Sequence, residues 1–419
     1  TVTPSGSDPF ERIDMVEDHP DTPSEQYGSR AYLDIHINGP DLINIYLSSS
    51  SQNIPLQVEH VKLGNIDSLQ TLQNLCYNME ELRSFEVGNT SNITNWSSAF
   101  VNCLNMQEYP EFQFASGCNL TSMFHTNRSL LKVPSSISGS YPTSMSQTFR
   151  ACNSLTSIPY IDTSNTTSFY RTFRDCLSVT HLPDYDFSSA TRIDECFYNC
   201  NILEEIPKSF EVPSVTHTKG LQNTFGICQS IKNIHYFDTS HITNFTNSFY
   251  SCRNLQRIPA FDFSSATTMS SAFYSCYNLR SLPLIDATGC TSMYRTFYAC
   301  YKLESIDGLP TPNATDFRDS FNGCYQLKEI PSGFTTESAS YISAFDNFLS
   351  NTLKITSLPE GVCSGFGNAG VTDYGEALES TNIYSLPDSF TGINNNASNI
   401  TTYDQLFNAV QQIKYVPTI

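Results

Sequence analysis

The sequence predicts a repeat solenoid with a small β-structured cap at its N-terminal end, and three observations carry that prediction. One pattern, Phe-x-x-Cys-x-x-Leu-x-x-Ile-Pro, recurs along most of the 419 residues. Its Phe-type position returns mostly every 24 residues, a period typical of stacked supersecondary units. Nine of the 14 cysteines and eleven of the 21 prolines occupy fixed places in the pattern. We therefore expect one array, and not several globular domains, over residues 72–419.

The residues before the array differ from it. Residues 1–30 hold no apolar period, and we expect them to form an extended acidic arm that anchors the protein to other structural proteins of its assembly. The arm's acidic side chains are Asp8, Glu11, Asp14, Glu17, Asp18, Asp21 and Glu25. Within residues 31–71, alternation of apolar and polar residues in 32–37 and, less regularly, in 56–63 predicts strands. These strands are expected to form the cap that covers the apolar end of the first turn.

Each turn of the array is expected to have two walls. Met293, Phe297 and Cys300 illustrate a spacing of four and three residues, which places three side chains on one face of a short helix or 3₁₀ turn. The Leu-x-x-Ile-Pro segment predicts a very short strand on the other wall, closed by a proline that cannot donate to a ladder. The predicted repeat core includes Phe149, Cys152, Phe173, Cys176, Phe197, Cys200, Phe249, Cys252, Phe273, Cys276, Phe297, Cys300, Phe321 and Cys324.

This arrangement resembles the BspA-type leucine-rich repeat, a subfamily of surface proteins of bacteria and protists that also occurs in phage genomes. The resemblance covers residues 72–419 and rests on the repeated cores and on phrases such as Asp162-Thr-Ser-Asn-Thr-Thr-Ser. It implies a leucine-rich-repeat-like solenoid of about 14 turns that serves adhesion or the binding of protein or glycan. Where Thr352, Ser380 and Val410 replace the Cys, the repeats are longer, and surface loops are expected there.

Composition and motifs argue against several classes of function. The chain has 41 acidic and 22 basic residues, a net charge of −19 that disfavours nucleic acid and anionic membranes as partners. The sequence contains no long apolar run of the kind that predicts insertion into a membrane. The G-x-G-x-x-G match at 365–370 lies outside any βαβ unit, and Cys196 and Cys200 lack a suitably spaced His ligand. We therefore expect no cofactor, no zinc site and no enzymatic activity.

An aspartate recurs thirteen residues after the Phe-type position. Because Ser or Thr follows two residues later, the main interpretation is an Asx-turn or N-cap that satisfies backbone N–H groups at each bend. Stacked carboxylates would also suit a cation, so a cation ladder stays open as the alternative. The aspartates are Asp162, Asp186, Asp238, Asp262 and Asp286.

Tyrosines that directly follow a Phe or a Cys form a candidate binding strip. Because Phe and Cys are expected to face inward, these neighbours are expected to point outward or sideways. There they could stack on sugar rings or contact a protein partner. The structural alternative is packing between adjacent turns. The strip consists of Tyr250, Tyr274, Tyr277, Tyr298, Tyr301 and Tyr325.

From these features we predict a non-enzymatic structural or adhesion protein on the outside of a virion, as a phage fibre, decoration or receptor-binding component. Its ligand would be a host-surface protein or glycan, and it would be multimeric in situ. Cysteines whose spacing indicates no disulfide pairing favour this choice. So does the first residue, because removal of an initiator Met is enough to explain why the sequence begins at Thr1. The alternatives are a secreted or cell-surface adhesin and a subunit of an extracellular filament.

Overall fold

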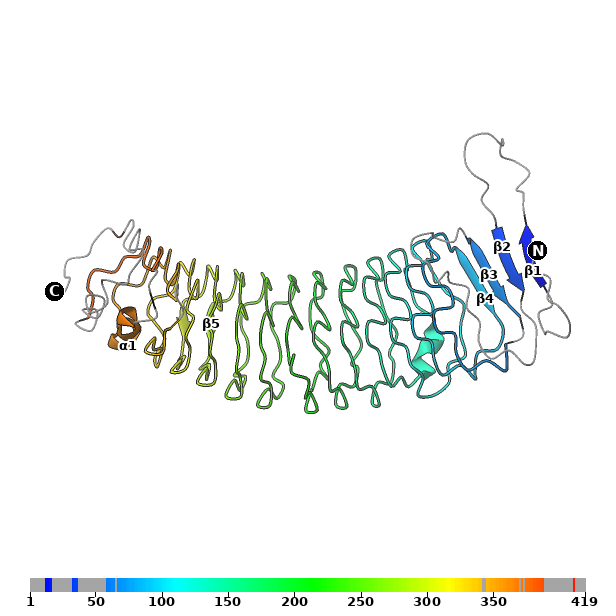
Figure 1. The fold of residues 1–419 in the computed structure, drawn as a ribbon, viewed down its shortest axis with the longest axis horizontal. Helices are drawn as coiled ribbons and strands as arrows, with labels where there is room; N and C mark the ends of the chain where they lie inside the picture. The colour runs from blue at the N-terminus through cyan, green and yellow to red at the C-terminus, as the bar shows by residue number, and fades with distance from the viewer. Residues whose placement is uncertain are drawn as a thin grey trace, which may run out of the picture. The chain divides into compact units, whose positions relative to one another are not determined.

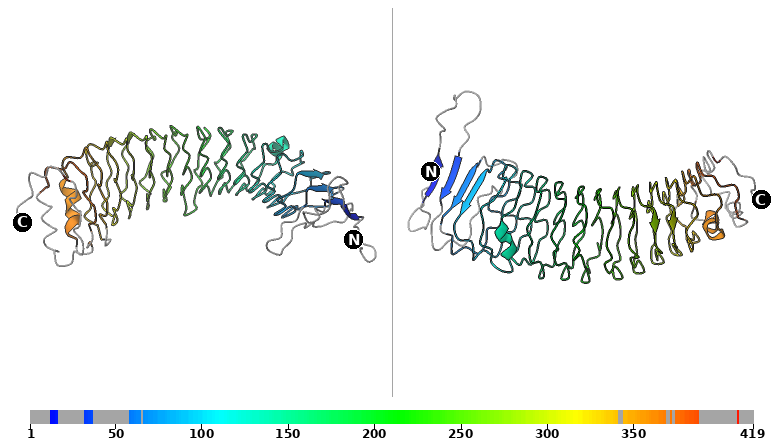
Figure 2. Two further views of the ribbon diagram at one scale, coloured as in Figure 1. Left: turned by 90° about the horizontal axis from the view of Figure 1, so that it is seen from above. Right: turned by 180° about the vertical axis from the view of Figure 1, so that it is seen from behind.

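The computed structural model describes residues 12–16, 32–36, 58–64, 66–340, 344–368, 371, 374–387 and 410. Contacts divide the chain into two compact units. Unit 1 comprises Thr1–Thr191 with Pro207–Phe210, and unit 2 comprises Arg192–Ile206 with Glu211–Ile419. Within each unit, repeated turns of the backbone follow one another in chain order (Figure 1; Figure 2). The predicted repeat solenoid is therefore confirmed as the fold class.

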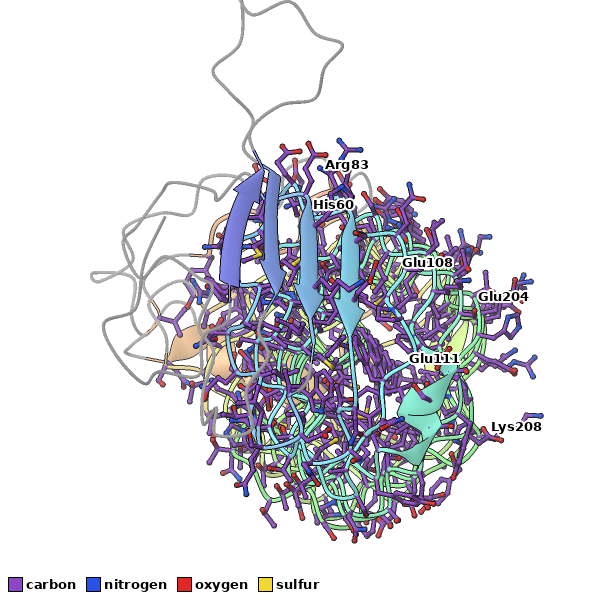
Figure 3. All side chains as sticks on the ribbon, turned by 90° about the vertical axis from the view of Figure 1, so that its right-hand side faces the viewer. His60, Arg83, Glu108, Glu111, Glu204 and Lys208 are labelled. Atoms are coloured by element: carbon purple, nitrogen blue, oxygen red, sulfur yellow. The ribbon has the colours of Figure 1, made fainter. Side chains whose placement is uncertain are left out.

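Four strands begin unit 1: β1 (Arg12–Val16), β2 (Tyr32–His36), β3 (His60–Leu63) and β4 (Ser84–Val87). β1 and β2 pair antiparallel, whereas β3 and β4 pair parallel, and β2 lies beside β3 (Figure 3). β2 and β3 confirm the two strands that alternation predicted before the first turn.

β1 lies in the segment for which we expected an extended acidic arm, and no strand was predicted there. The strand is short, and its charged residues Arg12 and Asp14 alternate with Ile13 and Met15, a pattern that five residues make too weak to detect. The rest of residues 1–30, with the expected anchoring contact, lies outside the described residues.

The strand wall of the array is reduced to short pairings, as the prolines predicted. In unit 2, β5 (Ser281–Leu282) pairs parallel with β6 (Ser305–Ile306). On the same wall an isolated parallel bridge joins Asn233 to Arg257. Other isolated bridges, such as Asn95 to Asn119 in unit 1, join residues five positions before the Phe-type residue, where the other wall begins. A 3₁₀ helix, η1 (Ser135–Gly139), interrupts the pattern in unit 1.

The lengthened repeat after Pro359 differs from the expected surface loop. It contains the short helix α1 (Glu360–Cys363) and the 3₁₀ helix η2 (Ser364–Gly367), with Val362, Cys363 and Phe366 buried. A Cβ on Gly365 would lie 2.0 Å from a backbone oxygen, so close packing requires this glycine. That requirement accounts for the first glycine of the G-x-G-x-x-G match without a nucleotide.

The wall that carries the Phe and Cys residues is a chain of turns. Its N–H groups make the predicted 3₁₀-type bonds, for example from Thr296 to the carbonyl of Met293 and from Cys300 to that of Phe297. The φ angles of Arg295 and Ala299 are 53° and 56°, so a left-handed residue interrupts the helix at every fourth position. The same alternation recurs from Asn74 to Asn351.

Alternate N–H groups of this wall donate to the next turn. The pattern places the backbone of each turn in register with its successor and leaves few buried backbone groups unpaired. In one turn of unit 2 the donors Met293, Arg295, Phe297 and Ala299 pair with the carbonyls of Asp316, Arg318, Ser320 and Asn322.

The core consists of stacked Phe rings with a thiol column beside them. In unit 1 the ring of Phe149 lies 6.0 Å from those of Phe124 and Phe173. In unit 2 the ring of Phe273 lies 5.4 Å from Phe249 and 5.7 Å from Phe297. All 14 cysteines are buried free thiols. This packing excludes water from the interior of every described turn that carries the motif.

At least eight of the nine core cysteines also make a hydrogen bond that the sequence did not reveal. The Sγ–H donates to the carbonyl of the Phe-type residue one turn earlier, as from Cys252 to Phe225 at 3.0 Å and from Cys276 to Phe249 at 3.1 Å. Asn127, which stands where a Cys is expected, makes the same bond to Phe100 through its amide. The column thus selects a small buried donor, and not merely a small apolar residue.

Candidate functional site

The predicted tyrosine strip is two ladders of stacked rings in unit 2. In the first ladder the ring of Tyr274 lies 4.8 Å from Tyr250 and 4.7 Å from Tyr298. In the second ladder Tyr301 lies 4.7 Å from Tyr277 and 5.0 Å from Tyr325. The interplanar angles are 14° or less, so the rings stack face to face along the array.

The repeat register builds both ladders. One follows the Phe column by one residue and the other follows the Cys column by one, so successive turns place equivalent tyrosines above one another. The first ladder begins after Gly226, where a Cβ would lie 2.9 Å from the ring of Tyr198. Asn322 occupies the equivalent position in the turn after Tyr298.

Stacking determines what the ladders can offer a ligand. A ring inside a ladder has a neighbour on each face, so its edge and hydroxyl remain for contact, and flat stacking on a sugar is confined to a ladder's ends. Tyr301 and Tyr325 are 36% and 38% exposed. Burial, then the neighbouring tyrosines, raises the pKa of Tyr274 and of Tyr301, so these hydroxyls stay protonated at neutral pH. The alternative interpretation of the tyrosine strip was packing between adjacent turns. This packing is present, because the tyrosine rings of adjacent turns stack on one another.

Arginines lie against the ladders. The guanidinium carbon of Arg253 lies 5.3 Å from the ring centre of Tyr277, and that of Arg295 lies 5.8 Å from Tyr298. Arg295 also contacts Asp319, with Nε 3.0 Å from the carboxylate. These cation–π contacts fix the position of positive charge against the tyrosine rings.

A second surface, which sequence reasoning missed, adjoins the second ladder. We call it the basic face: the residues four to eight positions after the Phe-type residue in the six turns of unit 2 from Phe225 to Leu349. It carries seven basic and two acidic side chains in a chain with nearly twice as many acids as bases. The charged residues are Lys232, Arg253, Arg257, Arg280, Lys302, Glu304, Lys328, Glu329 and Lys354.

Most of these cations have no carboxylate partner. Lys328 pairs with Glu304 at 2.7 Å and lowers the pKa of that carboxyl. Among the residues that the structure describes, Lys232, Arg257 and Arg280 are exposed and make no ion pair. The sequence could have revealed this face if its charged residues had been grouped by their position within the repeat. The net negative charge of the whole chain conceals the basic residues that gather at these positions.

Unit 1 carries a different surface. A shallow cavity of about 750 Å³ lies over four of its turns, lined by Arg83, Asn105, Gln107, Glu108, Leu131, Lys132, Thr156 and Ser157. Its charges are partnered: Lys132 pairs with Glu108 at 2.6 Å and Arg83 with Glu59 at 3.6 Å. Figure 3 shows Arg83 and Glu108 pointing outward from unit 1. The cavity is therefore polar and close to electrically neutral.

The aspartate column makes the bonds of the Asx-turn interpretation. The backbone N–H of Ser164 donates to Asp162 at 3.0 Å, and hydrogen bonds from Ser164 lower the pKa of that carboxyl. The same bond joins Ser188 to Asp186, Ser240 to Asp238, Ser264 to Asp262 and Thr288 to Asp286. Within the described ranges no group of three or more His, Cys, Asp or Glu is placed to hold a metal, and this includes Cys196 and Cys200. The cation alternative stays a prediction.

In the part of the chain that the structure describes, no helix has the length and hydropathy needed to cross a bilayer.

The turns stack on one another with the same residue types pointing inward in each turn, while the outward residues differ from turn to turn. A protein of this kind is a repeat solenoid. The model of a family described as "Mycoplasma protein of unknown function, DUF285" matches residues 67–179, 118–223 and 219–334. Together these matches span residues 67–334, more than half of the chain. The chain therefore belongs to this family.

Several solved structures are similar to the chain. A leucine-rich cell surface protein from Faecalibacterium prausnitzii is 17% identical with a TM-score of 0.38, over 86% of this chain and 93% of that one. A leucine-rich repeat protein from Bacteroides ovatus is 12% identical with a TM-score of 0.37, over 90% and 89%. One from Eubacterium ventriosum is 14% identical with a TM-score of 0.35, over 72% and 91%. Their names agree with the leucine-rich-repeat resemblance, while the fold described above rests on this chain's own turns. No curated protein matches the chain.

Proposed function

We propose that the chain is a non-enzymatic binding protein displayed on the outside of a cell or a virion. Its contact surface is formed by the two tyrosine ladders and the basic face of unit 2, and its ligand is a protein or glycan on another surface. The observation that carries this proposal is the pair of ladders, which hold partly exposed tyrosines in fixed positions on successive turns.

The physical argument is pre-organisation. A tyrosine fixed by stacking loses little side-chain entropy on binding, and tyrosine and arginine are the residues that most often dominate interface energies. Its hydroxyl donates and accepts hydrogen bonds, which suits sugar hydroxyls and backbone groups equally.

A bead-adhesion assay tests the binding role. Beads coated with the full chain are incubated with intact bacterial and animal cells, and the Tyr301→Ala variant is expected to lower adhesion about tenfold, the scale of losing one interface hot spot. Tyr301→Phe keeps the stack but removes the hydroxyl, and Tyr160→Ala alters an exposed tyrosine of unit 1 as a control. Equal adhesion of all four proteins would contradict the assignment of the surface.

The location is a proposal in two forms. The leucine-rich protein from F. prausnitzii is named a cell surface protein, which supports a cell surface. The free thiols and the acidic arm support the other location, the surface of a virion. Immunogold labelling of intact producing cells and of any particles they release distinguishes the two, and a label found only inside the cell would contradict both.

We also propose that residues 1–30 and the cap bind other structural proteins of the same assembly. Seven acids within the first 25 residues support an electrostatic contact. Deleting residues 1–11, which precede β1, is expected to reduce incorporation into the assembly while cell adhesion of the isolated protein is retained. Unchanged incorporation would contradict this role.

A further inference from the structure

The basic face is periodic as well as charged. Lys232, Arg280 and Lys328 occupy one repeat position in alternate turns, with Gln256 and Glu304 between them. Stacked turns are about 4.8 Å apart, so cations in this column recur about every 10 Å. A ligand that matches this face must itself carry negative charge at regular intervals along a line.

Polar groups accompany the cations. Lys302 donates to the side-chain oxygen of Asn278 at 2.6 Å, and the amide of Asn278 donates to the carbonyl of Arg253 at 2.9 Å and to Asn254 at 3.2 Å. Tyr277 lies beside this row, under Arg253. The face therefore combines unpaired cations with amide and phenol groups that are fixed in position.

We propose that the basic face binds a linear acidic polysaccharide, bearing carboxylate or sulfate groups, laid along successive turns. The cations of alternate turns contact successive acidic sugars, while the Asn and Tyr side chains bind the sugar hydroxyls between them. This inference rests on the proposed binding function and names its ligand class.

Two other polyanions fit the face less well. Nucleic acid needs open aromatic faces for base stacking, and the ring faces inside the ladders are covered by neighbouring tyrosines. An acidic protein segment could repeat its carboxylates at this spacing only after ordering its backbone, which costs conformational entropy. The observations therefore favour the polysaccharide.

The test uses immobilised heparin, which carries sulfates, and polygalacturonate, which carries only carboxylates. Neutral dextran, poly-glutamate and single-stranded DNA serve as comparison probes. The full chain is expected to bind at least one acidic polysaccharide, more weakly as salt rises, and to bind dextran undetectably. The triple variant Lys232→Glu, Arg257→Glu, Arg280→Glu is expected to bind more than about tenfold more weakly.

A matched triple variant controls for total charge. Arg128→Glu, Lys208→Glu, Lys219→Glu changes the net charge by the same amount at exposed positions outside the basic face. It is expected to bind within about twofold of the unaltered chain. Thermal melting of both variants checks that each is folded.

Three outcomes overturn the inference: equal loss in both triple variants, dextran binding equal to that of the acidic probes, or DNA or poly-glutamate binding at least as tightly as both polysaccharides. Cell adhesion that is lost in the Tyr301→Ala variant, together with no binding of either acidic polysaccharide by the unaltered chain, would remove this inference and leave the proposed function standing. If the protein binds polysaccharide but is found only inside cells, this inference stands and the proposed function falls.

Discussion

The two units share their inward residues and differ in their outward ones. In unit 1, the five turns from Cys76 to Phe173 carry three acids and three bases at the positions that form the basic face of unit 2. Two of those bases, Arg83 and Lys132, pair with glutamates. In unit 2 the six turns from Phe225 carry seven bases and two acids. The repeat thus constrains the core and leaves the outward columns free to acquire a function.

The column that follows the Phe residues shows the same contrast. Unit 1 places Val101, His125 and Arg150 where unit 2 stacks its first tyrosine ladder. Burial, and next the nearby Arg150, lowers the pKa of His125 to about 4. One column therefore holds a half-buried neutral imidazole in unit 1 and an aromatic ladder in unit 2, so the units are expected to respond differently to pH.

The largest effect is expected where the units are alike. Phe149→Ala in unit 1 and Phe273→Ala in unit 2 each remove a fully buried ring between two stacked neighbours. Each should lower the free energy of unfolding by about 3–5 kcal/mol. Urea unfolding followed by circular dichroism measures both. A difference between them of more than about 2 kcal/mol, the spread of such substitutions, would show that the two cores are not equivalent.

Alkaline pH should separate the units. Nine of the 14 cysteines lie in unit 2 and five in unit 1. Burial raises the pKa of Cys252 and of Cys152 to about 12. An unfolded thiol titrates near pH 8.5, so above that pH the unfolded chain loses protons first and each thiol reduces stability by about 1.4 kcal/mol per pH unit. The stability is complete below the unfolded pKa and is lost as pH rises toward 12.

Pulse alkylation with peptide mass spectrometry follows this loss. The cysteines of unit 2 are expected to become reactive at lower pH than those of unit 1, and Cys252→Ala is expected to raise that pH relative to the unaltered chain. Earlier labelling of unit 1 would contradict the thiol-count argument.

Mild acid should act on unit 1 through His125. Because its folded pKa is lowered, the unfolded chain binds a proton between about pH 6.5 and 4 that the folded chain rejects, so stability falls as pH falls through that range. His125→Gln is expected to reduce the difference in melting temperature between pH 7 and pH 5. The emission of Trp96, the one tryptophan of the chain, reports on unit 1. The exposed His181→Gln is the control, and an equal effect of both variants would contradict the prediction.

The smallest effect is expected at the aspartate column, which both units share. Asp162→Ala in unit 1 and Asp262→Ala in unit 2 should each cost about 0.5–1 kcal/mol, the scale of a lost cap. Hydrogen bonds from Ser264 lower the pKa of Asp262, so its contribution is present above the unfolded pKa and is lost as pH falls through the folded one. A chelator should leave the melting temperature unchanged. A chelator-induced drop would favour the cation ladder instead.

Sequence predicted the features that repeat in residue type. The Phe and Cys spacing, the short strands and the apolar alternation at β2 and β3 all follow from residue pattern. The left-handed turns could be predicted only in part. Asn, Asp or Gly occupies several of these positions, such as Asn247, Asp319 and Gly323, but Arg295 and Ala299 carry no turn signature. The basic face escaped prediction because its cations lie in different motif positions and disappear in an acidic total.

The alternate N–H bonds of the turn wall have a direction. From Trp96 to Asn102 in unit 1, and from Met293 to Ala299 in unit 2, the donors all point to the following turn. The other wall has the opposite direction, since Arg280 and Glu304 donate to carbonyls of the preceding turn. Shortening the array at either side would therefore leave N–H donors without acceptors, those of the turn wall downstream and those of the other wall upstream. A buried N–H without a partner is rare in proteins, so an engineered fragment of this array requires a specific capping sequence at both ends.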